Sequence, residues 1–351
     1  MGYHYPILNK VFDYYKTQSV NFTNKSLFAC MHLLEPQLKM FEMLIDFGFT
    51  PENIHVIGKA YSTNQSVLDE LKYMRINAQQ PDFSNKNFDD QHSMNCRMLS
   101  SNINEVDCNI ILDDGGELIK SVQDKRISFA VEQTSSGYRK LENNEINFPI
   151  FNVARSKTKL TQESPLVARQ CWDRIENYID KEAISNPKIL IIGLGPIGSS
   201  IKQLIESENI VTEGIDIETE KKDLISYLNN ETPTIVIGAT GSSVLKSEDL
   251  DKIRSPNTYH FISVSSSDRE FPVSAFRDNN NVHDDVIYKN FVFVNNGFPI
   301  SFKGNRNELT PIEIEKTIAL LLGSVLHGVT KEMNVANGFI KVPKILEELV
   351  N

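Results

Sequence analysis

The sequence predicts an α/β protein built from two doubly wound domains, each with a parallel sheet. From about residue 26 onward, short apolar runs typical of buried strands alternate with stretches of helical periodicity. A length of 351 residues suits about two domains. In the stretch 188–199, an apolar strand runs into a glycine-rich turn and then into a helix. We therefore expect two Rossmann-like domains with a cleft between them.

The N-terminal part already alternates strands with helices. A helical lead-in precedes residue 25, and apolar strands begin near residues 26, 53, 109, 127 and 148. Helical spacing connects the first strands over 33–47 and 67–76. The segment 77–103 is rich in Asn, Asp and Ser, and for it we expect a surface loop with little regular structure.

The second part repeats the pattern. A long helix over 166–183 leads into it, and strands begin near residues 188, 210, 234, 260 and 290. An apolar helix over 311–326 is expected to return the chain to the first domain. The predicted domains are therefore 1–168, completed by 311–351, and 169–310.

The glycine turn of the second domain indicates a dinucleotide site. In the pattern Gly-x-Gly-x-x-Gly, backbone N–H groups and a helix N-terminus face a pyrophosphate, and an acid after the second strand binds the ribose diol. That acid is Asp216, 23 positions after Gly193. The third strand ends in Thr240 and Gly241, which would pass close under the cofactor. A structural turn without ligand is the alternative. The predicted residues for NAD are Gly193, Gly195, Pro196, Ile197, Gly198, Asp216, Thr240 and Gly241.

Composition excludes several other classes of function. The net charge is −10 and no cluster of five Lys or Arg residues occurs, so a nucleic-acid or anionic membrane partner is not expected. No apolar N-terminal segment indicates secretion, and we expect a cytoplasmic protein. None of the four cysteines forms a Cys-x-x-Cys pair or lies beside a histidine at ligand spacing. Neither a disulfide framework nor a metal site is expected.

Polar residues stand where strands of the first domain end. His32, Ser62 and the pair Asp113 and Asp114 all follow apolar runs. In open parallel sheets, ligands bind at the carboxyl ends of the strands. These side chains are therefore candidates for a substrate site, although a turn and a helix cap would also explain the two aspartates.

Five elements, taken together, resemble the S-adenosylhomocysteine hydrolase (adenosylhomocysteinase) family. Four of them are the segments 30–32, 111–117, 132–137 and 151–159, and the fifth is the glycine turn with its acid. Residues 61–63 match a further family segment, and the resemblance covers most of 26–245.

The resemblance implies a hydrolase of one-carbon metabolism with tightly bound NAD, which oxidises the ribose 3′-hydroxyl, eliminates the thiol, adds water and reduces the ketone again. It implies a nucleoside or sugar-like substrate, and we expect a homodimer or homotetramer. By position, the catalytic residues would be His32, Asp114, Lys159 and Glu163. The substrate would be bound by Glu132, Gln133, Ser62 and Thr63, with Thr134, Ser135 and Ser136 near the nicotinamide.

Several positions depart from the family. Gln133 replaces a ribose-binding glutamate, Glu163 replaces a shorter aspartate, and Ser266 stands where a second catalytic histidine is expected. The adenine-binding Gly-His-Pro is replaced by 303–308, and the C-terminal Lys…Tyr tail is missing. Two alternatives therefore stay open. One is an NAD(P)-dependent dehydrogenase of the 2-hydroxyacid class. The other is a catalytically inactive nucleotide-binding homologue with a regulatory role.

Overall fold

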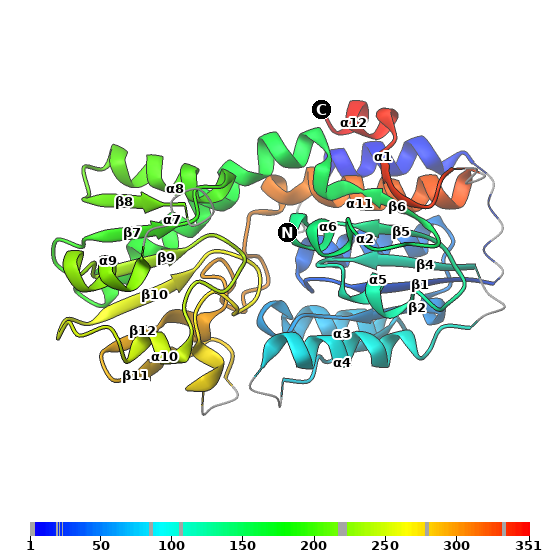
Figure 1. Ribbon diagram of the computed structural model, residues 1–351. Coiled ribbons are helices and arrows are strands. Elements are labelled where there is room, and N and C mark those ends of the chain that lie inside the picture. The colour runs from blue at the N-terminus through cyan, green and yellow to red at the C-terminus, as the bar shows by residue number, and fades with distance from the viewer. Residues whose placement is uncertain are drawn as a thin grey trace. The chain divides into compact units, whose positions relative to one another are not determined.

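The chain forms two compact units of α/β structure (Figure 1). The computed structural model describes residues 4–18, 20, 22, 24–83, 87–104, 108–216, 223–277, 281–331 and 335–351. Unit 1 consists of Met1–Asp82, Asp90–Glu163 and Gly304–Asn351. Unit 2 consists of Phe83–Asp89 and Ser164–Lys303. Apart from the short segment Phe83–Asp89, the chain passes between units after Glu163 and after Lys303, where the sequence placed the division at 168 and 310.

Unit 1 is organised around a parallel sheet of seven strands within the described residues, in the order β13-β6-β5-β4-β1-β2-β3. The strands are β1 Lys25–Cys30, β2 Ile54–Ile57, β3 Asn77–Gln79, β4 Cys108–Asp113, β5 Ile127–Glu132, β6 Pro149–Asn152 and β13 Gly338–Lys341. From β1 the chain builds outward to β2 and β3, and from β4 in the opposite direction to β5 and β6. The point where the order reverses therefore lies between β1 and β4, and a crevice at this place is where such sheets bind ligands.

Helices cover both faces of this sheet, because its central strands are apolar on both sides. One face packs against α1 Pro6–Lys16, α2 Glu35–Phe47, α3 Gln65–Tyr73, α11 Pro311–Thr330 and α12 Lys344–Val350. The other packs against α4 Phe88–Ser100, α5 Glu117–Ser121 and α6 Ser135–Leu141. Along β1, Leu27 and Ala29 point to the first face, and Phe28 and Cys30 to the second.

The expectation of an unstructured loop over 77–103 is wrong. The segment contains β3 and the helix α4. The buried residues of α4 recur every three or four positions, as in any helix that covers a sheet. Several of them are polar, however, which hides the helical period in the sequence. They are Phe88, Gln91, His92, Asn95, Cys96, Leu99 and Ser100.

Unit 2 contains a second sheet, in the order β11-β12-β10-β9-β7-β8. Only β11 runs antiparallel to its neighbour within the described strands. The strands are β7 Ile189–Ile192, β8 Thr212–Ile215, β9 Ile235–Gly238, β10 Tyr259–Ser263, β11 Val286–Tyr288 and β12 Phe291–Phe293. The helices α7 Ser164–Lys181 and α8 Pro196–Ser207 cover one face, and α9 Leu224–Glu231 and α10 Ser247–Leu250 the other. In this sheet the direction in which successive strands are added reverses between β7 and β9.

The prediction of two doubly wound, Rossmann-like α/β domains is confirmed. Besides β3, two further peripheral strands were not predicted, β11 and β13, which are short and half-buried. In the described part of the chain, no helix is both long and apolar enough to span a lipid bilayer.

Candidate functional site

The switch point of unit 1 brings the ends of β1 and β4 together. Cys30 pairs in register with Asp113, and the backbone N–H of Asp114 donates to the carbonyl oxygen of Cys30 at 2.9 Å. The next residues on each chain are therefore close neighbours. This position places two predicted catalytic residues, His32 and Asp114, at one point.

His32 lies between a hydroxyl and a carboxylate. Its Nδ1 is 2.5 Å from Oγ of Ser62, which belongs to the short 3₁₀ turn Ala60–Ser62, and its Nε2 is 3.3 Å from Oδ2 of Asp114. A carboxylate can only accept, so the neutral ring carries its proton on Nε2 and accepts the hydroxyl proton of Ser62 at Nδ1. The imidazole side chain is 14% exposed.

Lys59 is the fixed positive charge of this cluster. Its Nζ donates to Oδ1 of Asp114, and both side chains are almost completely buried. Burial by itself raises the pKa of Asp114, but the charges of Lys59 and His32 outweigh it and lower the pKa to about 2. Burial lowers the pKa of His32 to about 4, against the opposing charge of Asp114. At neutral pH the cluster is therefore an ionised Lys59–Asp114 pair next to a neutral imidazole.

This charge state separates the roles of the two predicted catalytic groups. Both pKa values lie below neutrality, so at neutral pH Asp114 is ionised and His32 is neutral. The geometry favours Asp114 as the group that orients His32, since a carboxylate on one ring nitrogen fixes the tautomer. His32 keeps a basic nitrogen at Nδ1, where Ser62 now binds.

The end of β5 forms a second polar cluster. Glu132 is fully buried, and its Oε1 accepts from the backbone N–H of Thr134 at 2.7 Å, from the Thr134 hydroxyl at 2.8 Å and from the backbone N–H of Gly115 at 3.2 Å. Thr134 also caps α6 by accepting from Gly137. Burial raises the pKa of Glu132 to about 7, although the hydrogen bonds from Thr134 act in the opposite direction. Glu132 therefore titrates near neutrality.

The residues next to this cluster make fewer side-chain hydrogen bonds. Gln133 is buried, and its Oε1 has no hydrogen-bond partner within the described residues. Ser135 and Ser136 form the first turn of α6, with Oγ of Ser136 3.5 Å from the Thr134 hydroxyl. Thr63 donates its hydroxyl to the carbonyl oxygen of Lys59 at 2.8 Å. Thr63 thus supports the turn that carries Lys59 and Ser62.

Lys159 and Glu163 lie at the two ends of a π-helical turn, Lys159–Glu163. Nζ of Lys159 donates to Oε1 of Glu163 at 2.7 Å, and Oε2 of Glu163 accepts from the hydroxyl of Thr317 on α11. The charge of Lys159 lowers the pKa of both His32 and Asp114, so the ammonium group lies within electrostatic range of the switch point. The four predicted catalytic residues are thus gathered in unit 1.

The glycine turn of unit 2 has the form that a dinucleotide needs. Gly193 has a φ of +97°, and a Cβ at Gly198 would lie 2.0 Å from the Gly193 carbonyl oxygen. These two glycines are required by the backbone itself. Gly195, the N-cap of α8, has an ordinary φ of −66°, and a Cβ there would meet nothing within 4 Å. Neither backbone conformation nor steric contact within the protein therefore requires a glycine at position 195. The open space beside Gly195 fits the close approach of a phosphate group.

Other predicted cofactor residues surround this turn. Pro196 and Ile197 open α8, and Asp216 follows β8 directly. Thr240 and Gly241 follow β9, but their backbone N–H groups donate to Oε1 of Glu270 at 2.5 and 3.0 Å. Glu270 is fully buried, and burial raises the pKa of its carboxyl. In this structure an internal carboxylate therefore takes the donors that the sequence assigned to the cofactor.

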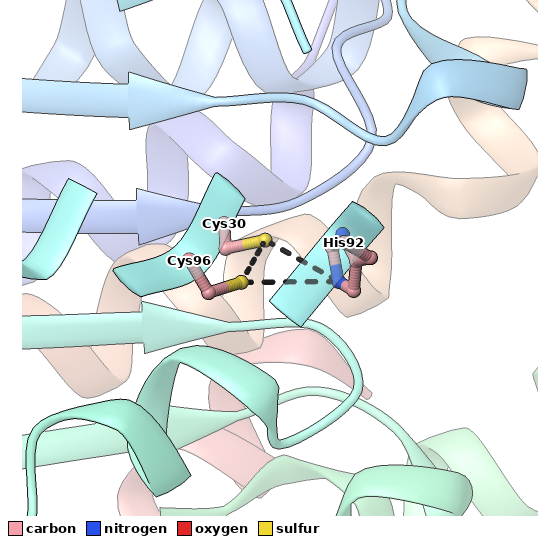
Figure 2. Close-up of side chains that lie close together, drawn as sticks. All are labelled: Cys30, His92 and Cys96. Atoms are coloured by element: carbon pink, nitrogen blue, oxygen red, sulfur yellow. Dashed lines mark hydrogen bonds between the residues drawn. The ribbon is translucent and has the colours of Figure 1, made fainter. Parts of the chain in front are cut away.

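Sequence reasoning missed Lys59, Glu270 and a cysteine–histidine cluster. A lysine that directly follows an apolar strand was the available signal for Lys59. The prediction that no cysteine lies at ligand spacing from a histidine is wrong. His92 and Cys96 are one helical turn apart on α4, and their side chains meet Cys30 (Figure 2). The spacing went unrecognised because 77–103 was interpreted as a loop.

Comparison with known proteins places the chain among divergent relatives. No family model matches it. Its sequence is 28% identical over 335 residues to a protein of Mycobacterium tuberculosis that is described as uncharacterised, with 86% of this chain and 64% of that protein covered. The chain thus spans less than two thirds of the length of this relative. It is also 24% identical over 209 residues to the adenosylhomocysteinase of Acinetobacter baylyi, which covers 55% of this chain and 42% of the enzyme.

Solved structures with a similar arrangement of elements include two dehydrogenase-type enzymes. The NADPH-dependent glyoxylate/hydroxypyruvate reductase of Sinorhizobium meliloti has a TM-score of 0.42 and 9% identity, with 86% of this chain and 93% of that chain covered. The 3-phosphoglycerate dehydrogenase of Entamoeba histolytica, with NAD⁺ bound, has a TM-score of 0.42 and 10% identity, with 90% and 100% covered.

Proposed function

We propose that the protein is a nicotinamide-dependent oxidoreductase that acts on a secondary hydroxyl of a small hydroxy-acid or sugar-like substrate. The observation that carries this proposal is the open Gly195 in the glycine turn, because nothing in the chain itself explains a glycine there. The dinucleotide pyrophosphate would lie over Gly193, Gly195 and the start of α8, and Asp216 would bind the ribose diol. The cofactor, when bound, supplies the hydride acceptor or donor.

His32 is the residue proposed to handle the substrate proton. Oxidation of an alcohol requires that the hydroxyl proton be removed, and a neutral imidazole can accept it. Nδ1 is the basic nitrogen, since Nε2 faces Asp114. Ser62 occupies Nδ1 in this structure, so the substrate hydroxyl would either displace Ser62 or pass its proton through the Ser62 hydroxyl. The charge of Asp114 stabilises the imidazolium that forms, whereas the charge of Lys59 opposes it.

Lys159 is proposed to polarise the substrate hydroxyl. A nearby ammonium group lowers the pKa of an alcohol by stabilising the alkoxide. Lys159 is 12% exposed and is held by Glu163, so its position is fixed while one side stays open. Glu132, which titrates near neutrality, is a second polar group at the same strand ends.

The first test is the release of cofactor. Purified protein is denatured, and the supernatant is analysed for NAD, NADP and their reduced forms by mass spectrometry; binding of each to the stripped protein follows by fluorescence titration. The proposal expects a dinucleotide in at least one experiment. A protein that contains none and binds none contradicts it.

The second test is hydride transfer. Reduction of bound or added NAD is followed by near-ultraviolet absorbance with a panel of 2-hydroxy acids, sugars and nucleosides. Lys159→Gln should lower the rate by about 100-fold or more, the scale of a group that acts at the reacting atom. The matched control is Lys157→Gln, an exposed lysine of the same segment, which should retain the rate. Dinucleotide binding without hydride transfer to any alcohol would favour the inactive homologue instead.

A second candidate function is the hydrolysis of S-adenosylhomocysteine. It is supported by the partial match to an adenosylhomocysteinase and by the cluster of His32, Asp114 and Lys159 at one switch point. Incubation with S-adenosylhomocysteine separates the two functions. Release of homocysteine thiol supports the hydrolase, whereas reduced cofactor without thiol release supports a dehydrogenase that stops after oxidation.

A further inference from the structure

Three side chains of types that can ligate a metal, Cys30, His92 and Cys96, meet on the second face of the unit 1 sheet (Figure 2). Cys30 is the last residue of β1, and His92 and Cys96 lie four positions apart on α4, so that both point to the same side of this helix. Sγ of Cys30 lies 3.6 Å from Sγ of Cys96 and 3.8 Å from Nε2 of His92. The remaining edge, from Sγ of Cys96 to Nε2 of His92, is 4.0 Å.

These distances match the edges of a zinc coordination tetrahedron. Zn–S bonds of about 2.3 Å and a Zn–N bond of about 2.0 Å separate two sulfurs by about 3.8 Å, and a sulfur from a nitrogen by about 3.6 Å. The cluster therefore needs shifts of only a few tenths of an ångström to hold the ion. Two thiolates and a neutral imidazole also balance the charge of Zn²⁺, which suits a site whose three residues are all buried.

Asp113 provides an additional acceptor next to the cluster. It pairs in register with Cys30, so its side chain leaves the sheet on the same face. Its Oδ2 accepts from the backbone N–H of Ile119 at 2.8 Å, whereas its Oδ1 is buried without a hydrogen-bond partner in the described part of the chain. Asp113 does not belong to the group of residues whose ligand atoms all lie within 4.8 Å of one another. Its free oxygen suits a hydrogen bond from a metal-bound water rather than direct ligation.

We propose that Cys30, His92 and Cys96 bind a zinc ion, with the fourth position taken by water. The ion joins α4 to the end of β1, two residues before His32. It therefore acts as a positioning element for the switch point, because Cys30 also accepts the backbone hydrogen bond of Asp114. The site does not depend on the proposed oxidoreductase activity.

The test is metal binding by the unsubstituted protein. The chain is purified under reducing conditions, stripped with a chelator and titrated with Co²⁺. The proposal expects one ion per chain, with the intense visible bands of tetrahedral cobalt and a thiolate charge-transfer band, both removed by Zn²⁺. Absence of saturable binding, or cobalt bound without the thiolate band, overturns the proposal. This measurement needs no variant and no activity assay.

Variants then locate the site. Cys96→Ser and His92→Gln should abolish the tetrahedral cobalt spectrum, whereas Cys171→Ser, a buried cysteine of unit 2, should retain it. Asp113→Asn should raise the dissociation constant by about 10-fold, as expected for a partner of the bound water. Circular dichroism identifies variants that do not fold. A spectrum that persists in folded Cys96→Ser would place the metal elsewhere and contradict the assignment.

Discussion

The two units end their central strands at switch points of opposite chemistry. In unit 1 the strand ends carry charged side chains, and Asp114 lies at ion-pair distance from both Lys59 and His32. In unit 2 the corresponding point is a glycine turn, with open space beside Gly195. In the proposed function, the same topology would provide proton chemistry in one unit and a site for an anionic cofactor in the other. Substitutions can test whether unit 1 depends on its buried charges and unit 2 on its glycines.

The largest effect is expected for Lys59→Met. Removal of one member of a buried ion pair leaves Asp114 charged and unpaired, which costs about 3–5 kcal/mol of unfolding free energy. Chemical denaturation measures this loss. The control is Lys289→Met, whose partner Asp251 is exposed, and which should change stability by less than about 1 kcal/mol. Equal effects of the two substitutions would mean that unit 1 is not held by its buried charge.

Gly198→Ala should destabilise unit 2 by about 1–3 kcal/mol, because the new Cβ overlaps the Gly193 carbonyl oxygen and the turn must shift. Dinucleotide binding should be lost with it. A variant that keeps full stability and dinucleotide binding would show that the turn does not require a glycine at position 198.

Glu132 gives unit 1 a dependence of its stability on pH. The pKa of this glutamate is raised in the folded state, to about 7 from an ordinary 4.5, so the folded state binds more protons between these values. Its contribution to stability is therefore greatest below about pH 4.5 and is lost as the pH rises through about 7. In Glu132→Gln this decline, on the order of 1–3 kcal/mol, should disappear from denaturation curves recorded across that range. A decline that persists in the variant must come from other groups.

The smallest effect on stability is expected for Gly195→Ala. The methyl group enters open space at an ordinary φ, so the melting temperature should stay unchanged. The affinity for dinucleotide should fall by about 10-fold or more, since the methyl group occupies the approach of the pyrophosphate. Paired with Gly198→Ala, this substitution separates what the fold requires from what the ligand requires. Unchanged affinity would remove the main support for the proposed function.

Local patterns predicted most of the fold because they depend only on residues that are adjacent in the sequence. Apolar runs and the Gly-x-Gly-x-x-Gly turn identify strands and the βα unit wherever the chain later goes. The predicted loop over 77–103 failed for the opposite reason. The buried side of α4 is lined by Gln91, His92, Asn95 and Cys96, and their burial depends on partners far away in sequence.

The sequence by itself determined the two-domain α/β architecture, the glycine turn and Asp216, since backbone conformation and spacing are local properties. Only the tertiary structure decided which charges meet. Lys59 reaches Asp114 across the end of β1, Glu270 accepts from the backbone of Thr240 and Gly241, and Cys30 meets side chains of a helix that was not predicted. A pKa or a ligand set depends on distances between side chains from different strands. Those distances exist only after the sheet has assembled.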